Sequence, residues 1–459
     1  MHRTANRHMQ QRVRCRARQA DTGAICKTLS TPEAEAQIAA LLPAHRNRVF
    51  KPLDTASMFV GQALSEDHSC QRAVNEAAIR RIAAGLEPCS THTGGFCKAR
   101  ERLPTAVLVT LARYVARQLA AGAAPSWEWR GRAVRIVDGT TLQMRDTPEN
   151  QQAYPQPRNQ QPGLGFPICR LVALLCLGSG SVLDAAIGAC RGKGGDEQSL
   201  LRSILDSLHS GDVLLGDALY PTYFLLCWLV ERGIDGVFEQ HGARQRTTDF
   251  RTGRHLGARD HVMTWPKPRV KPDWMSTAEY EAAPQTLQVR ELRAGGKTLV
   301  TTLLCPKQAP KAEVAALFAQ RWNVELDLRN IKTTLGMEML SCHTPQMVIK
   351  EIWVYLLGYN LVRLMMVQAA GWADLLPRQI SFKHSLQVCT AWIHHTSVAN
   401  PIAREQLFVL LVQQRVGDRP GRVEPRAVKR RPKNHRLLTT PRDQARAQIR
   451  KCGHPSKLK

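Results

Sequence analysis

The segment RAVRIVDGTTL, residues 132–142, determines how the rest of the chain is interpreted. Its apolar residues alternate with polar ones, which is the pattern of a β-strand, and it runs into Asp138 and a Gly-Thr-Thr turn. A second apolar segment, DVLLGDALY at 212–220, contains Asp217 close to its end. The sequence therefore predicts two buried strands with a carboxylate near the carboxyl end of each.

The segments between these two strands predict more of the same sheet. RLVALLCL at 170–177 and SVLDAAIGA at 181–189 have the composition of two strands joined by a Gly-Ser-Gly turn. Gly178 and Asp184 interrupt this apolar stretch, so we do not expect it to span a membrane. The next patterns predict two helices and a strand, at 196–211, 221–233 and 235–240. This order indicates a mixed α/β sheet.

The chain has 459 residues and a formal net charge of +26, with 64 Lys and Arg against 38 Asp and Glu. Its hydrophobic fraction of 43% argues against a disordered chain, and its length allows two or three compact units. An excess of positive charge on this scale indicates a polyanionic partner, with nucleic acid as the first candidate.

The same patterns divide the chain into regions. Residues 1–45 predict a basic, disordered arm, 46–125 a helical DNA-binding domain, and 126–370 the α/β domain with a β-rich insertion at about 241–305. Two long helices, at 312–335 and about 345–370, should follow the insertion. Residues 371–459 predict a helical region and a basic tail, since the part from Arg415 onward has 15 Lys and Arg but three acidic residues.

Each aspartate alone is ambiguous, because Asp after a strand is commonly a turn former or a helix N-cap. A third carboxylate favours a site. In FAQRWNVELDLRNIK, residues 318–332, helical geometry places one charged stripe beside an apolar stripe that can pack on the sheet. Glu325 on this stripe could then reach the crevice that holds the two aspartates. The alternative is a solvated salt-bridge ladder. The charged stripe consists of Arg321, Glu325, Arg329 and Lys332.

These residues resemble the DDE transposases of bacterial insertion sequences, specifically the family-four group with a Tyr-Arg-Glu-Lys signature. The signature is Tyr, two residues, Arg, three residues, Glu, six residues, Lys, and it stands here with Phe318 replacing Tyr. The resemblance extends over most of the chain. Further blocks similar to that family are DGTTLQMRDTPENQQAYPQP (138–157), QPGLGFPICRLVAL (161–174), GDVLLGDALY (211–220), IKTTLGMEML (331–340) and EPRAVKRRPK (424–433).

The resemblance implies a ribonuclease-H-like catalytic domain with a β-rich insertion, preceded by a helical domain. It implies that Asp138, Asp217 and Glu325 form the catalytic triad and bind two Mg²⁺ ions, for which Mn²⁺ can substitute. Oxygen ligands suit these cations and do not suit zinc.

The resemblance also implies roles in DNA binding. Arg321 and Lys332 would hold backbone phosphates, whereas Phe318 keeps an aromatic ring but loses the hydrogen bond of a tyrosine. Trp265 is the candidate to take up a flipped base; the alternative is an indole packed in a β core. Glu197, which opens the helix at 196–211, either supports the metal site or is simply favoured at a helix N-terminus.

The function implied is a cytoplasmic, nucleoid-associated bacterial transposase that excises and inserts an insertion sequence by metal-dependent phosphodiester hydrolysis and strand transfer. Its expected partners are double-stranded DNA, as terminal inverted repeats and as target, and a second copy of the chain on paired ends; no membrane is expected. One alternative is a catalytically inactive DNA-binding derivative that inhibits transposition. A stand-alone nuclease would not need the basic tail.

Overall fold

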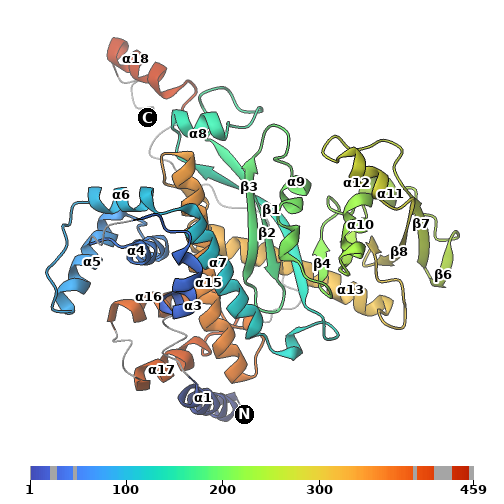
Figure 1. Cartoon of the computed structure of the whole chain (residues 1–459), viewed down its shortest axis with the longest axis horizontal. Coiled ribbons are helices and arrows are strands. Elements are labelled where there is room, and N and C mark those ends of the chain that lie inside the picture. Colours follow the sequence, from blue (N-terminus) through green and yellow to red (C-terminus); the bar gives the residue numbers. More distant parts are fainter. Residues whose placement is uncertain (1, 21–27, 45–48, 396–400, 418–436, 454–459) are drawn as a thin grey trace, which may run out of the picture.

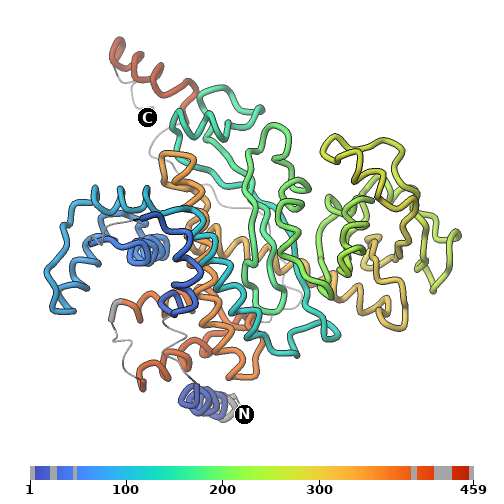
Figure 2. Tube along the Cα trace, in the orientation of Figure 1, coloured from blue at the N-terminus to red at the C-terminus, as the bar shows by residue number. Residues whose placement is uncertain are grey.

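The computed structural model describes residues 2–20, 28–44, 49–395, 401–417 and 437–453 (Figures 1 and 2). In this part of the chain, ten strands form one sheet in the order β3-β2-β1-β4-β5-β9-β8-β7-β6, and β10 pairs with β1 outside this path. The strands are β1 (Val134–Met144), β2 (Ile168–Cys176), β3 (Val182–Ala189), β4 (Val213–Gly216), β5 (Asp235–Glu239), β6 (Arg254–Gly257), β7 (Asp260–Pro266), β8 (Thr286–Ala294), β9 (Lys297–Thr301) and β10 (Met339–Leu340).

The central strand β1 connects two kinds of pairing. It pairs antiparallel with β2, which pairs antiparallel with β3, and it pairs parallel with β4, which pairs parallel with β5. The mixed α/β sheet predicted from the sequence is confirmed, and the long apolar stretch forms the β2–β3 hairpin.

The β-rich segment after β5 extends the same sheet. Strand β9 pairs antiparallel with β5, and β8, β7 and β6 follow in antiparallel order. Gly295 and Gly296, both with positive φ, make the tight turn between β8 and β9. This segment lies at one end of the molecule, opposite the amino-terminal helices (Figure 1).

One long helix, α15 (Pro345–Ala373), runs through the middle of the molecule (Figure 1). Thr344 caps its amino terminus, and it packs against α7 and α4 on one side and against β3 on another. Among the described residues α15 is the helix long and apolar enough to cross a membrane, but 78% of its apolar window is buried inside the protein. Its composition is therefore that of a core helix.

The amino-terminal helices do not form a separate core. Val107, Leu108 and Leu111 of α7 are fully buried in the hydrophobic cluster that includes Ile352 of α15 and Ile136 of β1. These helices are α3 (Pro32–Ala39), α4 (Pro52–Leu64), α5 (Cys70–Ala83), α6 (Gly94–Arg102) and α7 (Thr105–Ala121).

The predicted disordered arm at 1–45 is wrong for much of its described part, because residues His2–Gln19 form helix α1. Met9, Val13 and Ala17 recur every four residues and are buried, and α1 packs on α17 (Pro401–Leu411) and α15. Three apolar residues among many arginines give a weak sequence pattern, but they form one continuous stripe on a helix.

The two faces of the sheet are covered by different elements. Ile136 of β1 faces the cluster with α15, whereas Val137 faces a second cluster formed with α9 (Glu197–Arg202), α10 (Tyr223–Glu231) and the β-rich segment. The remaining helices are α8 (Pro148–Ala153), α11 (Gly242–Gln245), α12 (Thr277–Ala282), α13 (Lys311–Ala319), α14 (Asn323–Arg329), α16 (Phe382–His395) and α18 (Arg442–Cys452).

Two predicted helices are interrupted. The helix expected at 196–211 ends as α9 at Arg202, followed by a short 3-10 turn at Leu205–Ser207. The helix expected at 312–335 divides into α13, a 3-10 turn, α14 and a π-helical turn at Asn330–Thr334. In the basic tail, α18 is helical, and the block at 424–433 lies outside the described residues.

Candidate active site

Strand register places the two predicted aspartates opposite each other. Ile136 of β1 pairs with Leu215 of β4, so Asp138 and Asp217 each lie two residues further along parallel, adjacent strands. Strand β4 ends at Gly216, whereas β1 continues to Met144. Asp138 therefore lies in the middle of its strand, and the turn expected at Gly139–Thr141 is wrong, because these residues pair with β2. The two aspartates lie where the pairing of β1 with β4 stops, and open α/β sheets hold ligands in such a crevice.

Local hydrogen bonds orient both aspartates. The Asp138 Oδ1 atom accepts the amide of Gly139 at 2.8 Å, and the Asp217 Oδ1 atom accepts the amide of Leu219 at 2.8 Å. Burial raises the pKa of Asp138 from 3.8 to about 6, with a further upward push from the charges of Asp217 and Glu197. The Gly139 amide and Arg321 act in the opposite direction. The upward shift is therefore due mainly to burial, and the nearby carboxylates add to it.

Glu325 and Asp138 both form an ion pair with the same side chain, Arg321. The guanidinium of Arg321 lies 3.7 Å from Asp138 Oδ2 and 4.0 Å from Glu325 Oε1, measured from its two terminal nitrogens. Arg321 is mostly buried, whereas the Glu325 side chain is 42% exposed. The expected approach of α14 to the strand ends is therefore present, with Arg321 between the two carboxylates.

In the described part of the chain, no three Asp, Glu, His or Cys side chains form a ready-made metal site. The Arg321 guanidinium supplies the positive charge that lies between Asp138 and Glu325.

The π-helical turn determines where Lys332 lies. In this turn the amide of Leu335 bonds to the carbonyl of Asn330, five residues earlier, and such turns are frequent at functional sites. The Lys332 ammonium donates to the hydroxyl of Thr140 at 3.2 Å, two residues beyond Asp138. Lys332 therefore lies beside the same strand end as the carboxylates.

The two aromatic side chains predicted to contact DNA are buried. Phe318, at the end of α13, is 9% exposed, and the Arg321 guanidinium carbon lies 5.9 Å from its ring centre. Trp265 is 4% exposed, donates from its indole to Glu291 at 3.1 Å and is covered by Arg244. The packed alternative for Trp265 is thus the one observed, and the exposed indoles in the described part of the chain are Trp274 and Trp322.

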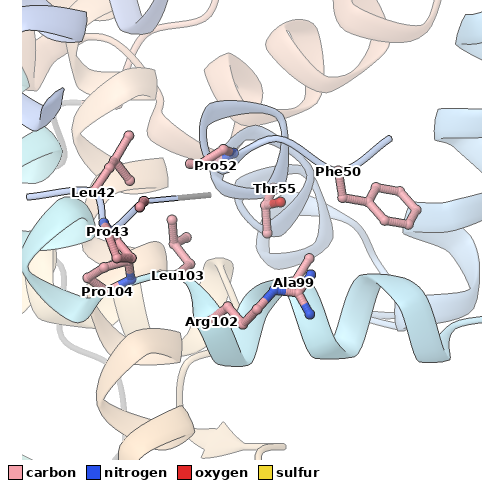
Figure 3. Close-up of a pocket in the computed structure, with 10 residues that line it drawn as sticks. Leu42, Pro43, Phe50, Pro52, Thr55, Ala99, Arg102, Leu103 and Pro104 are labelled. Carbon is pink, nitrogen blue, oxygen red and sulfur yellow. The ribbon is translucent and has the colours of Figure 1, made fainter. Parts of the chain in front are cut away.

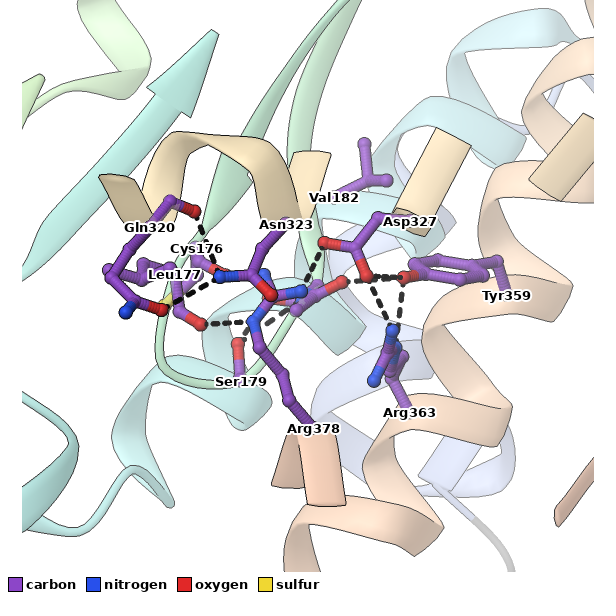
Figure 4. A network of polar contacts seen from close by, with 12 residues as sticks. Cys176, Leu177, Ser179, Val182, Gln320, Asn323, Asp327, Tyr359, Arg363 and Arg378 are labelled. Atoms are coloured by element: carbon purple, nitrogen blue, oxygen red, sulfur yellow. Dashed lines mark hydrogen bonds and ion pairs between the residues drawn. The ribbon is translucent and has the colours of Figure 1, made fainter. Parts of the chain in front are cut away.

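A buried polar network that sequence reasoning missed holds α14 in place (Figure 4). Asp327 is 1% exposed and accepts from Arg363 at 2.6 Å and from the Tyr359 hydroxyl at 3.1 Å, both on α15. Arg378 contacts its other oxygen at 2.7 Å. Charged residues within the apolar helix α15 and next to Glu325 are the signal that could have indicated this network.

The pocket in Figure 3 lies away from the candidate carboxylate site. It measures about 390 Å³ and lies among the amino-terminal helices, and none of the predicted site residues lines it. A duplex is held on open, charged surface rather than in an enclosed cavity, so this pocket does not compete with the carboxylate site. Its lining includes Leu42, Phe50, Thr55, Arg102 and Pro104.

Comparisons with known proteins show which family the chain belongs to. The sequence profile of the transposase DDE domain matches residues 129–361, which include all three carboxylates. The transposase InsG for insertion sequence element IS4 of Escherichia coli K12 is 26% identical over 390 residues, covering 81% of this chain and 84% of InsG. The putative transposase InsZ of the same organism is 28% identical over 137 residues, 30% of this chain and 45% of InsZ.

Among solved structures, a piggyBac transposase synaptic complex with hairpin DNA aligns with 88% of this chain and 87% of its own. Its TM-score of 0.39 and identity of 10% are too low to support an argument from it. The family profile, in contrast, spans half of the chain and the whole carboxylate site. The protein therefore belongs to the DDE transposases, and it is similar over most of its length to the IS4 group of bacterial insertion sequences.

Proposed function

We propose that Asp138, Asp217 and Glu325 are the catalytic carboxylates of this transposase and hold divalent cations, two Mg²⁺ ions or Mn²⁺ in their place. The observation that carries the proposal is that one guanidinium, Arg321, bridges a carboxylate on β1 and a carboxylate on α14. A cation is therefore already accommodated between residues that lie 187 positions apart in the chain.

The donor set fits such cations. All three side chains offer carboxylate oxygen, which Mg²⁺ and Mn²⁺ prefer. The pKa of Asp138 is raised mainly by burial, with smaller contributions from the Asp217 and Glu197 carboxylates, and a bound cation would favour its ionised form. When bound, the cations would supply a stronger nucleophile and stabilise the leaving oxygen at phosphorus.

The basic side chains would hold the DNA backbone. Arg321 and Lys332 lie at the same strand end and can contact phosphates on either side of the scissile bond. The ring of Phe318 packs near the Arg321 guanidinium, and this contact needs no hydroxyl. The Phe318 ring thus keeps the guanidinium in place although it cannot donate a hydrogen bond.

The strand order supports a ribonuclease-H-like catalytic domain within residues 126–370. Three antiparallel strands followed by two parallel ones, with helices on both faces, are consistent with that fold, and the segment at about 241–305 would be its insertion. On this proposal the remaining helices and the basic tail serve DNA binding.

The partners we propose are the element's terminal inverted repeats, target DNA and a second copy of the chain on paired ends, on the bacterial nucleoid. The charge of +26 supports a polyanionic partner. Because the three carboxylates are all present, the inactive inhibitor is the less favoured alternative.

Alanine substitution of each carboxylate tests the proposal. Asp138→Ala, Asp217→Ala and Glu325→Ala should each lower the rate of DNA cleavage in Mg²⁺ by several orders of magnitude, since each removes a cation ligand. Binding to a duplex with the element's end should stay within about twofold of wild type. Glu313→Ala, which removes an exposed acid on α13, is the matched control and should cleave normally. Wild-type cleavage by any of the three variants would reject that residue's role.

A further inference from the structure

Glu197 lies at the same strand end as the proposed triad. Its carboxylate rests against Gly139, the neighbour of Asp138, so closely that a Cβ at residue 139 would come within 2.6 Å of both carboxylate oxygens. Residue 139 therefore has to be glycine for Glu197 to occupy this place. The backbone of Gly139 is ordinary extended strand, so the requirement is for space and not for conformation.

The position of Glu197 is not explained by its place at a helix amino terminus. Asp196 is the N-cap of α9 and accepts the amide of Ser199 at 2.9 Å, so the capping role is filled. The Glu197 side chain reaches instead to β1, and its Oε2 accepts the hydroxyl of the fully buried Tyr220 at 3.2 Å. A preference for acidic residues at a helix N-terminus therefore explains why residue 197 is a glutamate, but it does not explain the contacts of its side chain.

Glu197 has an ion-pair partner and a carboxylate as neighbours. The Nε of Arg170 lies 3.8 Å from Glu197 Oε1, and the charge of Glu197 also acts on Asp138. Helix α9 covers one face of β1 and α14 the other, so Glu197 and Glu325 approach the Asp138–Gly139 segment from opposite faces of the sheet. A carboxylate kept next to other carboxylates without a full partner costs stability unless a cation binds there.

We propose that Glu197 is a fourth carboxylate of the cation site, held over Gly139 by Tyr220, and that it binds divalent cation together with Asp138 and Asp217. The inference rests on the proposed function, because it assigns a further ligand to the same site. It predicts that Gly139 and Glu197 depend on each other: replacing either residue should remove the contact of the Glu197 carboxylate with the cation.

The test is Mn²⁺ binding to the full chain without DNA, measured by calorimetry. Glu197→Gln, which keeps the size of the side chain, should weaken Mn²⁺ binding by about 10- to 100-fold. Gly139→Ala should weaken it by a similar factor, because the methyl group displaces the carboxylate, and adding it to Glu197→Gln should bring little further loss. The matched control is Glu149→Gln, an exposed acid in the first turn of the equally short helix α8, which should bind as wild type.

Thermal unfolding in EDTA separates this role from a purely structural one. If Glu197 served only as the ion-pair partner of Arg170, Glu197→Gln would lower the Tm, whereas loss of the charge of a cation ligand beside other carboxylates should leave the Tm unchanged or raise it. Wild-type Mn²⁺ affinity in Glu197→Gln, or a lower Tm in EDTA, would overturn the inference. If Asp138→Asn and Asp217→Asn lose Mn²⁺ binding while Glu197→Gln does not, only the Glu197 assignment fails. If none of the three loses it, the proposed function fails as well.

Discussion

At the level of single residues, Asp138 is a largely buried carboxylate. Its side chain is 18% exposed, and burial raises its pKa by more than the Gly139 amide and Arg321 lower it. An unfolded chain would ionise this aspartate near pH 4, whereas the folded chain does so near pH 6. The folded state therefore holds this proton more tightly than the unfolded state does.

Stability without metal should therefore fall as the pH rises. Between about pH 4 and pH 6 the folded state binds more protons, so the free energy of unfolding decreases, by on the order of 2 kcal/mol in all. Asp138→Asn cannot ionise, so its free energy of unfolding should not decrease in this way. The variant should be more stable than wild type at pH 7.5 and equally stable below pH 4. Urea denaturation in EDTA at both pH values measures the difference. A variant less stable than wild type at pH 7.5 would show that the carboxylate is stabilising.

The sequence could indicate these candidate residues because apolar strands and helix stripes are local patterns. Asp138 and Asp217 follow apolar runs, and Glu325 shares a stripe with Arg321. The position of Trp265 could not be predicted in this way, since its burial depends on Arg244 and Glu291 from other segments. The contact of Glu197 with Gly139 likewise joins two segments that no periodicity connects.

At the scale of elements, helix α14 is positioned by charge as well as by apolar packing. Its residues Val324 and Leu328 are buried, and its Asp327 forms ion pairs with Arg363 and Arg378. The sequence predicted one continuous helix here, because the apolar stripe persists through the breaks. After the π turn the chain returns to β1, with which β10 pairs in parallel.

Removing the buried acid should release this helix. Asp327→Ala leaves two mostly buried guanidinium groups without their partner, which should cost about 3–5 kcal/mol in the free energy of unfolding. The comparison is Glu313→Ala, whose partner Arg130 is exposed and which should unfold at the same urea concentration as wild type. Equal unfolding midpoints for Asp327→Ala and wild type would mean that the network does not hold α14.

At the scale of the whole molecule, the amino-terminal helices and the sheet share one hydrophobic core. Deleting the helices would expose α15, so the proposal that they bind DNA has to be tested by surface substitutions rather than by truncation. Hydrophobic periodicity predicted the strands and α7 well. That α7 packs on α15, about 240 residues later, depends on tertiary contacts that the local sequence does not encode.

The basic tail can be removed without opening this core. A chain that ends at Gly417 keeps the hydrogen bond between Val416 and Gln379 and is shorter by 14 of the Lys and Arg residues. We expect it to bind specific and random duplexes with a similar decrease in affinity. Its binding should also depend less steeply on salt, by about 0.9 in log–log slope for each phosphate that the tail no longer neutralises. Competition binding at two salt concentrations measures both effects. A decrease confined to the specific complex would assign sequence recognition to the tail.

We propose that Asp138 holds a catalytic cation, and a change of metal preference is a sharp test of this role. Asp138→Cys places sulfur at the ligand position, and sulfur is a poor ligand for Mg²⁺ but a better one for the softer Mn²⁺. Cleavage of duplexes carrying the element's ends should be lost in Mg²⁺ and recover at least tenfold in Mn²⁺. Asp138→Ala should stay inactive in both. Cleavage by Asp138→Cys in Mg²⁺ at the wild-type rate would contradict the account.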